Sequence, residues 1–79
     1  MNMSWSTLEG NWKVIENNWK LYIGRVKAQW GKLTDEQLVM IGGEREKLSK
    51  RIQIAYGLTK QEADVQIRGF EDRITFFRV

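Results

Sequence analysis

The sequence predicts an all-α fold, and three observations support that prediction. The 79 residues contain no proline, so no helix is interrupted by a residue that lacks a backbone N–H. Apolar residues recur at spacings of three and four, which is the period of a helix, and strand alternation of useful length is missing. Two short segments also carry the stop and start signals of successive helices. The length allows one domain with one modest core, over residues 1–79.

The first predicted helix spans Thr7 to Trp30, and its sequence has a seven-residue repeat. Its apolar seam has the spacing of a packed helix and, beginning with Trp5 just before the helix, consists of Trp5, Leu8, Trp12, Ile15, Trp19, Tyr22 and Val26. A straight helix of this length measures about 36 Å, which exceeds the diameter of roughly 30 Å expected for such a globule. We therefore expect residues 1–9 to overhang the core or fray, with a kink or late start at Gly10.

Two joints of similar sequence divide the chain, WGKLTDEQ from Trp30 to Gln37 and YGLTKQE from Tyr56 to Glu62. In each, an aromatic residue ends a helix, and a glycine is expected to take the left-handed stop conformation. A threonine then begins the next helix as its N-cap, and Gln37 or Glu62 completes a capping box three residues later. The joints predict helical segments before Trp30, from Asp35 to Tyr56 and after Lys60.

The middle segment is expected to bend or split at the glycine pair Gly42-Gly43. Its apolar residues are Leu38 and Ile41 before the pair and Leu48, Ile52 and Ala55 after it. The last helix is more regular, with an apolar face of Ala63, Ile67, Phe70, Ile74 and Phe77 and an outer ladder of Asp64, Arg68 and Asp72.

The composition excludes most site chemistry. Histidine and cysteine are both missing, which removes the usual proton shuttle, thiolate nucleophiles, disulfides and the commonest metal ligands. The longest apolar run is four residues, so we expect no membrane span, no signal peptide and a cytoplasmic location. We expect no enzyme, no cofactor, no metal and no small-molecule substrate.

The tryptophan seam has two interpretations. It packs on the last helix within the monomer, which we favour for Trp19 and Trp30, or it forms a contact surface. For Trp5 and Trp12 the two are evenly balanced, because exposed tryptophans on an overhanging heptad would require a fold-back or a second chain. Homodimerisation through Trp5, Leu8 and Trp12 is the specific form of this hypothesis.

The basic residues of the first helix are a second candidate surface. Lys13, Lys20, Arg25 and Lys27 would be the contacts if the chain tracked nucleic-acid phosphates. Glu9 and Glu16 interrupt this stripe, so a solvated helix face is favoured. The net charge of +3 indicates solubility and only a weak preference for acidic partners.

Both joints and the first helix resemble the CsbD-like family of small bacterial proteins associated with the general stress response. The resemblance is carried by GNWK (Gly10 to Lys13), GRVKAQWGKLTDEQL (Gly24 to Leu38) and YGLTKQEA (Tyr56 to Ala63). The motif N-W-K occurs twice here, which indicates a one-heptad duplication. The resemblance implies a bundle of about four helices packed as crossed hairpins, similar to SAM-domain-like orthogonal bundles, and it implies no mechanism.

These observations predict a non-enzymatic stress-response protein that acts as a small structural or interaction module, through an unidentified protein partner or through self-association. The alternative is a weak nucleic-acid-binding accessory protein that uses the basic helix face. A third possibility, a partly folded protectant, is disfavoured by the regular seams and capping boxes.

Overall fold

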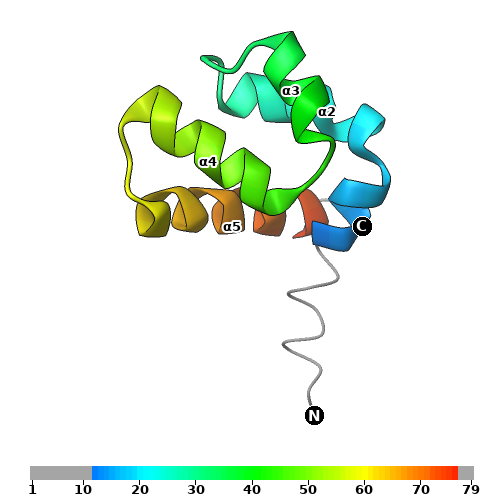
Figure 1. The fold of residues 1–79 in the computed structure, drawn as a ribbon. Helices are drawn as coiled ribbons and strands as arrows, with labels where there is room; N and C mark the ends of the chain where they lie inside the picture. The colour runs from blue at the N-terminus through cyan, green and yellow to red at the C-terminus, as the bar shows by residue number, and fades with distance from the viewer. Residues whose placement is uncertain (1–11, 77–79) are drawn as a thin grey trace.

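The computed structural model describes residues 12–76, and that part of the chain consists of helices joined by short turns, without strands (Figure 1). A helical segment at 12–17 is followed by α2 (Trp19–Gln29), α3 (Asp35–Ile41), α4 (Arg45–Tyr56) and α5 (Lys60–Phe76). Helices α4 and α5 form a hairpin, and α2 and α3 lie across it. The predicted all-α bundle is therefore confirmed.

The predicted continuous first helix is wrong, because the described part of it breaks at Asn18. The Asn18 side chain donates through Nδ2 to the Val14 carbonyl at 2.8 Å, which ends the segment at 12–17. Asn18 has φ −123° and ψ 40°, and α2 then starts in a new direction. Asparagine is a weak helix former that bonds readily to nearby backbone. The expected kink at Gly10 lies outside the described residues.

The break lets two tryptophans reach separate carbonyl groups around the α3–α4 turn. Trp12 donates from Nε1 to the Gly43 carbonyl at 2.8 Å, and Trp19 donates from Nε1 to the Leu38 carbonyl at 3.0 Å. The segment at 12–17 is therefore docked on the turn between α3 and α4.

Both predicted capping boxes are present. Thr34 accepts from the Gln37 backbone N–H at 3.1 Å, and the Gln37 side chain accepts from the Thr34 N–H at 3.0 Å. Thr59 and Glu62 repeat this exchange at 3.1 and 2.9 Å. These reciprocal bonds satisfy N–H groups that would otherwise lack partners at each helix start.

The two joints differ in how the preceding helix ends. Gly57 has φ +66°, as expected for a left-handed stop. Gly31 does not have a positive φ, so that prediction is wrong at the first joint. There the chain leaves α2 at Trp30, and the Leu33 N–H donates to the Trp30 carbonyl. Lys27 donates from Nζ to the Leu33 carbonyl at 2.7 Å, so a side-chain hydrogen bond, rather than a left-handed glycine, holds the turn after α2.

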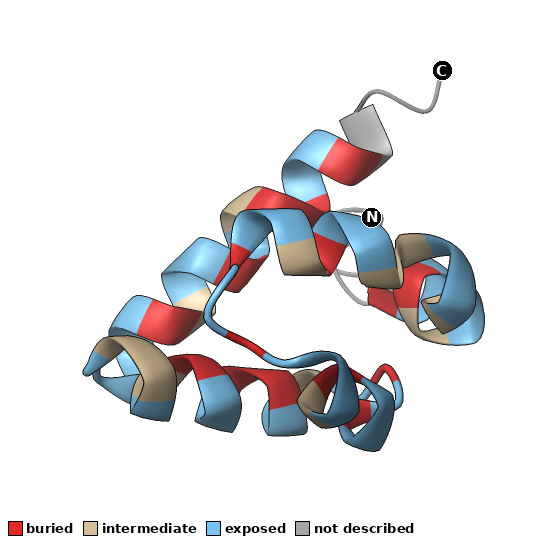
Figure 2. Cartoon of the chain, turned by 90° about the horizontal axis from the view of Figure 1, so that it is seen from above, coloured by how far each residue is buried: buried red, intermediate tan, exposed pale blue. Residues whose placement is uncertain are grey.

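The core lies between the two layers and contains the apolar residues that the helical spacing predicts (Figure 2). Trp30 is its largest fully buried side chain and contacts Phe70, with ring centroids 5.2 Å apart and planes inclined at 56°. Its Nε1 donates to Gln66 Oε1 at 2.9 Å. The buried apolar set is Trp12, Ile15, Val26, Trp30, Leu33, Leu38, Ile41, Leu48, Ile52, Ala63, Ile67, Phe70 and Ile74.

Candidate interaction surfaces

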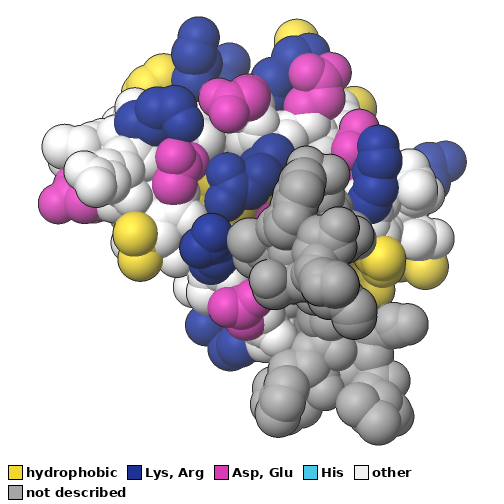
Figure 3. Space-filling model, turned by 90° about the horizontal axis from the view of Figure 1, so that it is seen from below, with side chains coloured by type: hydrophobic (Ala, Val, Ile, Leu, Met, Phe, Trp, Pro, Cys, Tyr) yellow, Lys and Arg dark blue, Asp and Glu magenta, His cyan; other side chains and the backbone are white. Residues whose placement is uncertain are grey.

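A groove of about 760 Å³ runs between the segment at 12–17 and the hairpin of α4 and α5. Its walls are Trp12, Lys13, Glu16, Arg45, Gln61, Asp64, Val65, Arg68 and Glu71. Three basic and three acidic residues balance one another, beside the aromatic ring of Trp12 and the exposed Val65. The face of α5 seen in Figure 3 accordingly shows basic and acidic side chains interspersed.

Arg45 organises the inner wall of this groove. Its guanidinium lies 3.5 Å from Asp64 Oδ1 through Nη1 and 3.4 Å from Glu71 Oε2 through Nε. Asp64 also accepts from Ser49 Oγ at 3.1 Å and from Lys60 Nζ at 2.9 Å. The inner charges are therefore largely committed to one another, and they join α4 to α5.

The two carboxyl groups of this network have opposite pKa shifts. Burial raises the pKa of Glu71, and the nearby Arg45 guanidinium only partly offsets that effect. The hydrogen bond from Lys60 lowers the pKa of Asp64, and the Ser49 hydroxyl adds to that effect. Both carboxyl groups thus engage partners within the fold.

The sequence pattern misplaced Asp64 and missed Glu71. The helical period places Asp64 on the outer ladder of the last helix, but in the structure Asp64 is half-buried against α4. Glu71 is 3% exposed. It follows Ile67 by four residues and precedes Ile74 by three, so its position on the apolar face was readable from the helical period.

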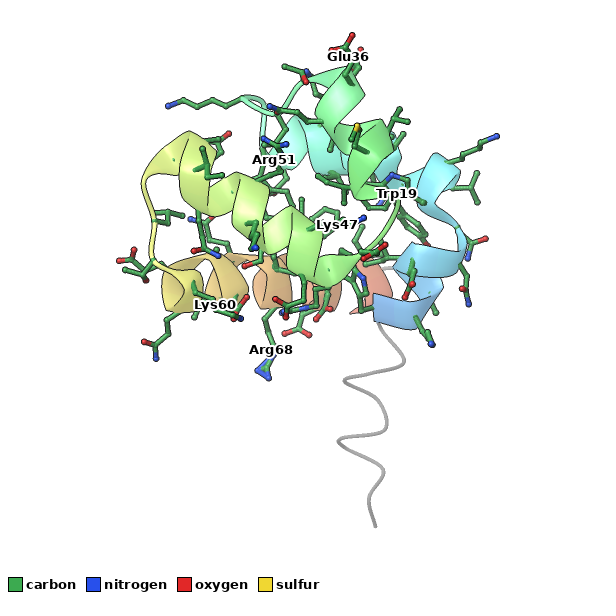
Figure 4. All side chains as sticks on the ribbon, viewed as in Figure 1. Trp19, Glu36, Lys47, Arg51, Lys60 and Arg68 are labelled. Carbon is green, nitrogen blue, oxygen red and sulfur yellow. The ribbon has the colours of Figure 1, made fainter. Side chains whose placement is uncertain are left out.

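The rim of the groove carries charges that the inner network does not use. Lys13, Arg68 and the acidic Glu16 form no salt bridge within the described residues. Arg68 projects from α5 away from the bundle (Figure 4). Lys13 and Arg68 outnumber Glu16, and Val65 is 67% exposed, so the rim combines a small excess of positive charge with an apolar side chain.

The predicted tryptophan surface is only partly within the described residues. Trp12 is 6% exposed and its indole N–H is bonded to Gly43, so most of this ring belongs to the core, and one edge lines the groove. Of the two interpretations given for Trp12, the structure agrees with packing inside the monomer for most of this ring. Trp5 and Leu8 lie outside the described residues. Trp30 is fully buried, as predicted, and Trp19 is partly buried.

The four predicted phosphate contacts do not form one continuous stripe. Lys13 lies on the segment at 12–17, whereas Lys20, Arg25 and Lys27 lie on α2 beyond the break at Asn18. The Lys27 ammonium group is bonded to the Leu33 carbonyl and lies 3.8 Å from Asp35 Oδ1. Lys20 and Arg25 remain exposed on α2.

The two joints contact each other, which the sequence alone did not indicate. The Tyr56 hydroxyl accepts from the Lys32 backbone N–H at 3.1 Å, and the Lys32 ammonium lies 5.0 Å from the centre of the Tyr56 ring. A smaller hollow of about 390 Å³ lies beside this contact, lined by Lys32, Gln37, Arg51, Ile54 and Ala55. The charged residues of its lining are all basic.

Large apolar side chains are exposed at several places outside the core. Leu21, Val39, Met40, Ile54 and Val65 are each at least two-thirds exposed. Between residues 12 and 76 we find no group of three acidic side chains arranged to hold a metal ion. None of the described helices is long and apolar enough to cross a membrane.

The fold and these surfaces define a small helical protein whose prominent features are two hollows and scattered apolar side chains. The chain is 47% identical over 49 residues to a UPF0337 protein of Pectobacterium atrosepticum, covering 62% of this chain and 71% of that protein. It is 45% identical over 50 residues to the UPF0337 protein YjbJ of Escherichia coli strain K12, covering 63% and 72%.

A UPF0337 protein of Nitrosomonas europaea is 41% identical over 68 residues, which covers 86% of this chain and 65% of that protein. The chain therefore belongs to the UPF0337 family, to which CsbD also belongs. No family model matches the chain, and no solved structure matches it either.

Proposed function

We propose that the chain is a non-enzymatic interaction module of the CsbD type that accumulates under stress and binds a protein segment in the groove between the segment at 12–17 and α5. The observation that supports this proposal is the composition of the groove. Its inner charges are neutralised by one another, while its rim offers cations outside the salt-bridge network and an exposed valine. Amphipathic segments bind to surfaces of this mixed kind.

The groove favours a partner with both apolar and acidic side chains. Val65 and the edge of Trp12 would contact apolar side chains, and Lys13 and Arg68 would contact carboxylates. Arg45 contributes less to recognition, because its guanidinium is engaged by Asp64 and Glu71. Cytoplasmic location is part of the same proposal.

Site-specific photocrosslinking in bacterial cells tests the groove. A photoreactive amino acid at Val65 is expected to give a discrete crosslinked protein, and the same group at the exposed Ala28 of α2 is the matched control. Adding Arg68→Glu should weaken the Val65 product at least about fivefold, since it places a negative charge against the acidic side of the partner. Identical products from both positions would reject the groove as the binding site.

The stress-response part of the proposal is tested by abundance. Quantitative immunoblotting of cells before and after salt, heat and ethanol treatment should show a rise of several-fold under at least one of them. Constant abundance under all three would reject this part while leaving the groove experiment unaffected.

Nucleic-acid binding is the weaker alternative, since Lys27 is engaged within the fold and Lys13 is separated from Lys20 and Arg25 by the break at Asn18. A fluorescent oligonucleotide titration at two salt concentrations distinguishes it. Binding that weakens steeply with salt and is lost in Lys20→Glu/Arg25→Glu would favour this alternative.

A further inference from the structure

The hollow at the joints and the exposed face of α3 are complementary in charge and are both apolar. Glu36, Val39 and Met40 occupy one face of α3, because side chains three and four positions apart lie together on a helix. Val39 and Met40 are 67% and 72% exposed. Glu36 is exposed and forms no salt bridge within residues 12–76.

The hollow presents the opposite charge with a similar apolar content. Arg51 is exposed on α4 and has no salt bridge to the described residues, and Ile54, three positions later, is 73% exposed. Lys32 lines the opposite side of the hollow and is held over Tyr56 by its backbone hydrogen bond and its contact with the ring. The hollow therefore provides two cations around an apolar floor.

The two surfaces are neighbours on the same molecule. Gln37 lines the hollow, and the adjacent Glu36 begins the exposed face of α3. Figure 4 shows Glu36 projecting from the top of α3, with Arg51 on α4 below it. Adjacent complementary surfaces suit a two-fold arrangement, in which each copy supplies one surface of each kind and the same contact forms twice.

We propose that this chain pairs with a second copy of itself, the α3 face of each copy seated in the joint hollow of the other. Glu36 then lies opposite Arg51, and Val39 and Met40 cover Ile54. One contact accounts for three exposed large apolar side chains and two charges that have no salt bridge within the described residues. It goes beyond the proposed function, because it uses neither the groove nor Trp5, Leu8 and Trp12.

The contact area is small, so the dimer is weak. α3 has only seven residues, and contacts of this size fall in the range of transient complexes. We expect an apparent dissociation constant below about 1 mM. Sedimentation equilibrium of the full chain up to that concentration should show the mass rising from that of the monomer towards twice 9.3 kDa.

Charge exchange provides the sharp test. Glu36→Lys alone and Arg51→Glu alone each place like charges at both copies of the contact, so each variant should dimerise at least about tenfold more weakly. An equimolar mixture of the two should dimerise again. In the mixed dimer the introduced lysine meets the introduced glutamate, and the native Arg51 meets the native Glu36. Both variants are altered at exposed positions, so they should remain folded, which circular dichroism checks.

Met40→Lys is a second variant that removes the apolar half of the contact, and Val65→Lys is its matched control on the groove. Met40→Lys should also weaken the dimer at least about tenfold, whereas Val65→Lys should leave it unchanged. A wild-type chain that stays monomeric, or folded charge variants that fail to pair when mixed, would overturn the proposal. The Val65 crosslink is independent of either result, so the two proposals fail separately.

Discussion

Among the glycines that the structure describes, Gly43 has the least room for a side chain. It has φ +88°, and a Cβ at this position would lie 3.1 Å from the Glu16 carbonyl oxygen and 3.2 Å from the Glu16 Cα. Both neighbours are backbone atoms that cannot move independently of the segment at 12–17. The conformation and the close approach therefore both require glycine.

Gly43→Ala is expected to lower the free energy of unfolding by about 2 kcal/mol or more, from left-handed strain and the contact with Glu16. Gly24→Ala is the control, because it lies within α2 with no atom within 4 Å of an added Cβ. That change should stabilise the chain by up to about 1 kcal/mol. Urea denaturation measures both, and equal effects of the two variants would contradict the packing described for Gly43.

The glycines also show which backbone conformations can be predicted from the sequence. The stop at Gly57 and the split at Gly42-Gly43 were both predicted, because local conformation decides them. Gly31 differs because Lys27 reaches across the joint to the Leu33 carbonyl, a contact that depends on how the next segment is placed. No stop signal in the local sequence indicates this bond, which joins residues six positions apart.

The helix break before α2 is another feature that the local sequence does not predict. The seven-residue repeat of the segment at 12–17 continues into α2, so the periodicity alone favours one helix. The burial that the apolar seam predicts is nevertheless present for Trp12, Ile15 and Val26, which are all in the core. The break at Asn18 accompanies the docking of Trp12 on the carbonyl of Gly43, a contact between residues 31 apart that the local sequence does not reveal.

The candidate sites are harder to predict from the sequence than the core is. The groove and the hollow each combine residues from elements far apart in the chain, such as Lys13 with Arg68 and Lys32 with Arg51. Helical periodicity identifies the face of one helix but not its neighbour. The buried Glu71 is the exception, because its position on the apolar face follows from the spacing.

The pairing of α4 with α5 depends on a buried carboxylate and the guanidinium of Arg45. Arg45→Met should lower the free energy of unfolding by about 3 kcal/mol, because it removes the cation that lies against the buried Glu71. Glu71→Met combined with Arg45→Met should recover part of this loss. Chemical denaturation at neutral pH measures both, and a double variant no more stable than Arg45→Met would contradict this account.

Asp64 gives the hairpin a dependence on pH. Its pKa is lowered in the folded chain by Lys60 and Ser49, so its ionised form contributes stability above the unfolded value near 3.8. That contribution is lost as the pH falls through the lower, folded-state pKa, because the folded state must then bind a proton. Wild-type stability should thus decline more steeply below about pH 4 than that of Asp64→Asn.

Glu71 contributes with the opposite sign. Its pKa is raised by burial, so the folded chain takes up a proton before the unfolded chain does, and stability falls as the pH rises through this range. Glu71→Gln should remove that slope and make the acid decline of the remaining chain steeper. Urea denaturation between about pH 3 and 7 measures both variants, and parallel curves for all three proteins would refute the assigned shifts.

At the scale of the whole molecule, the contact between the joints links the two layers of the bundle. Leu33, in the first joint, is fully buried. The residue before it, Lys32, donates its backbone N–H to the hydroxyl of Tyr56 in the second joint. A chain this short has a single core, so the layers should lose their structure together. This cooperativity distinguishes a folded module from a partly folded protectant.

Leu33→Ala tests this linkage, because it opens a cavity where the joint meets the core. The expected loss is about 3 kcal/mol, which corresponds to a melting temperature lower by on the order of 15 °C for a domain of this size. Circular dichroism reports all the helices, and tryptophan fluorescence reports the four tryptophans together, of which Trp12 and Trp30 lie in the core. The two melting curves should coincide in the wild type and shift together in the variant. Curves that separate, or a wild type that melts without a cooperative transition, would show that the layers fold independently.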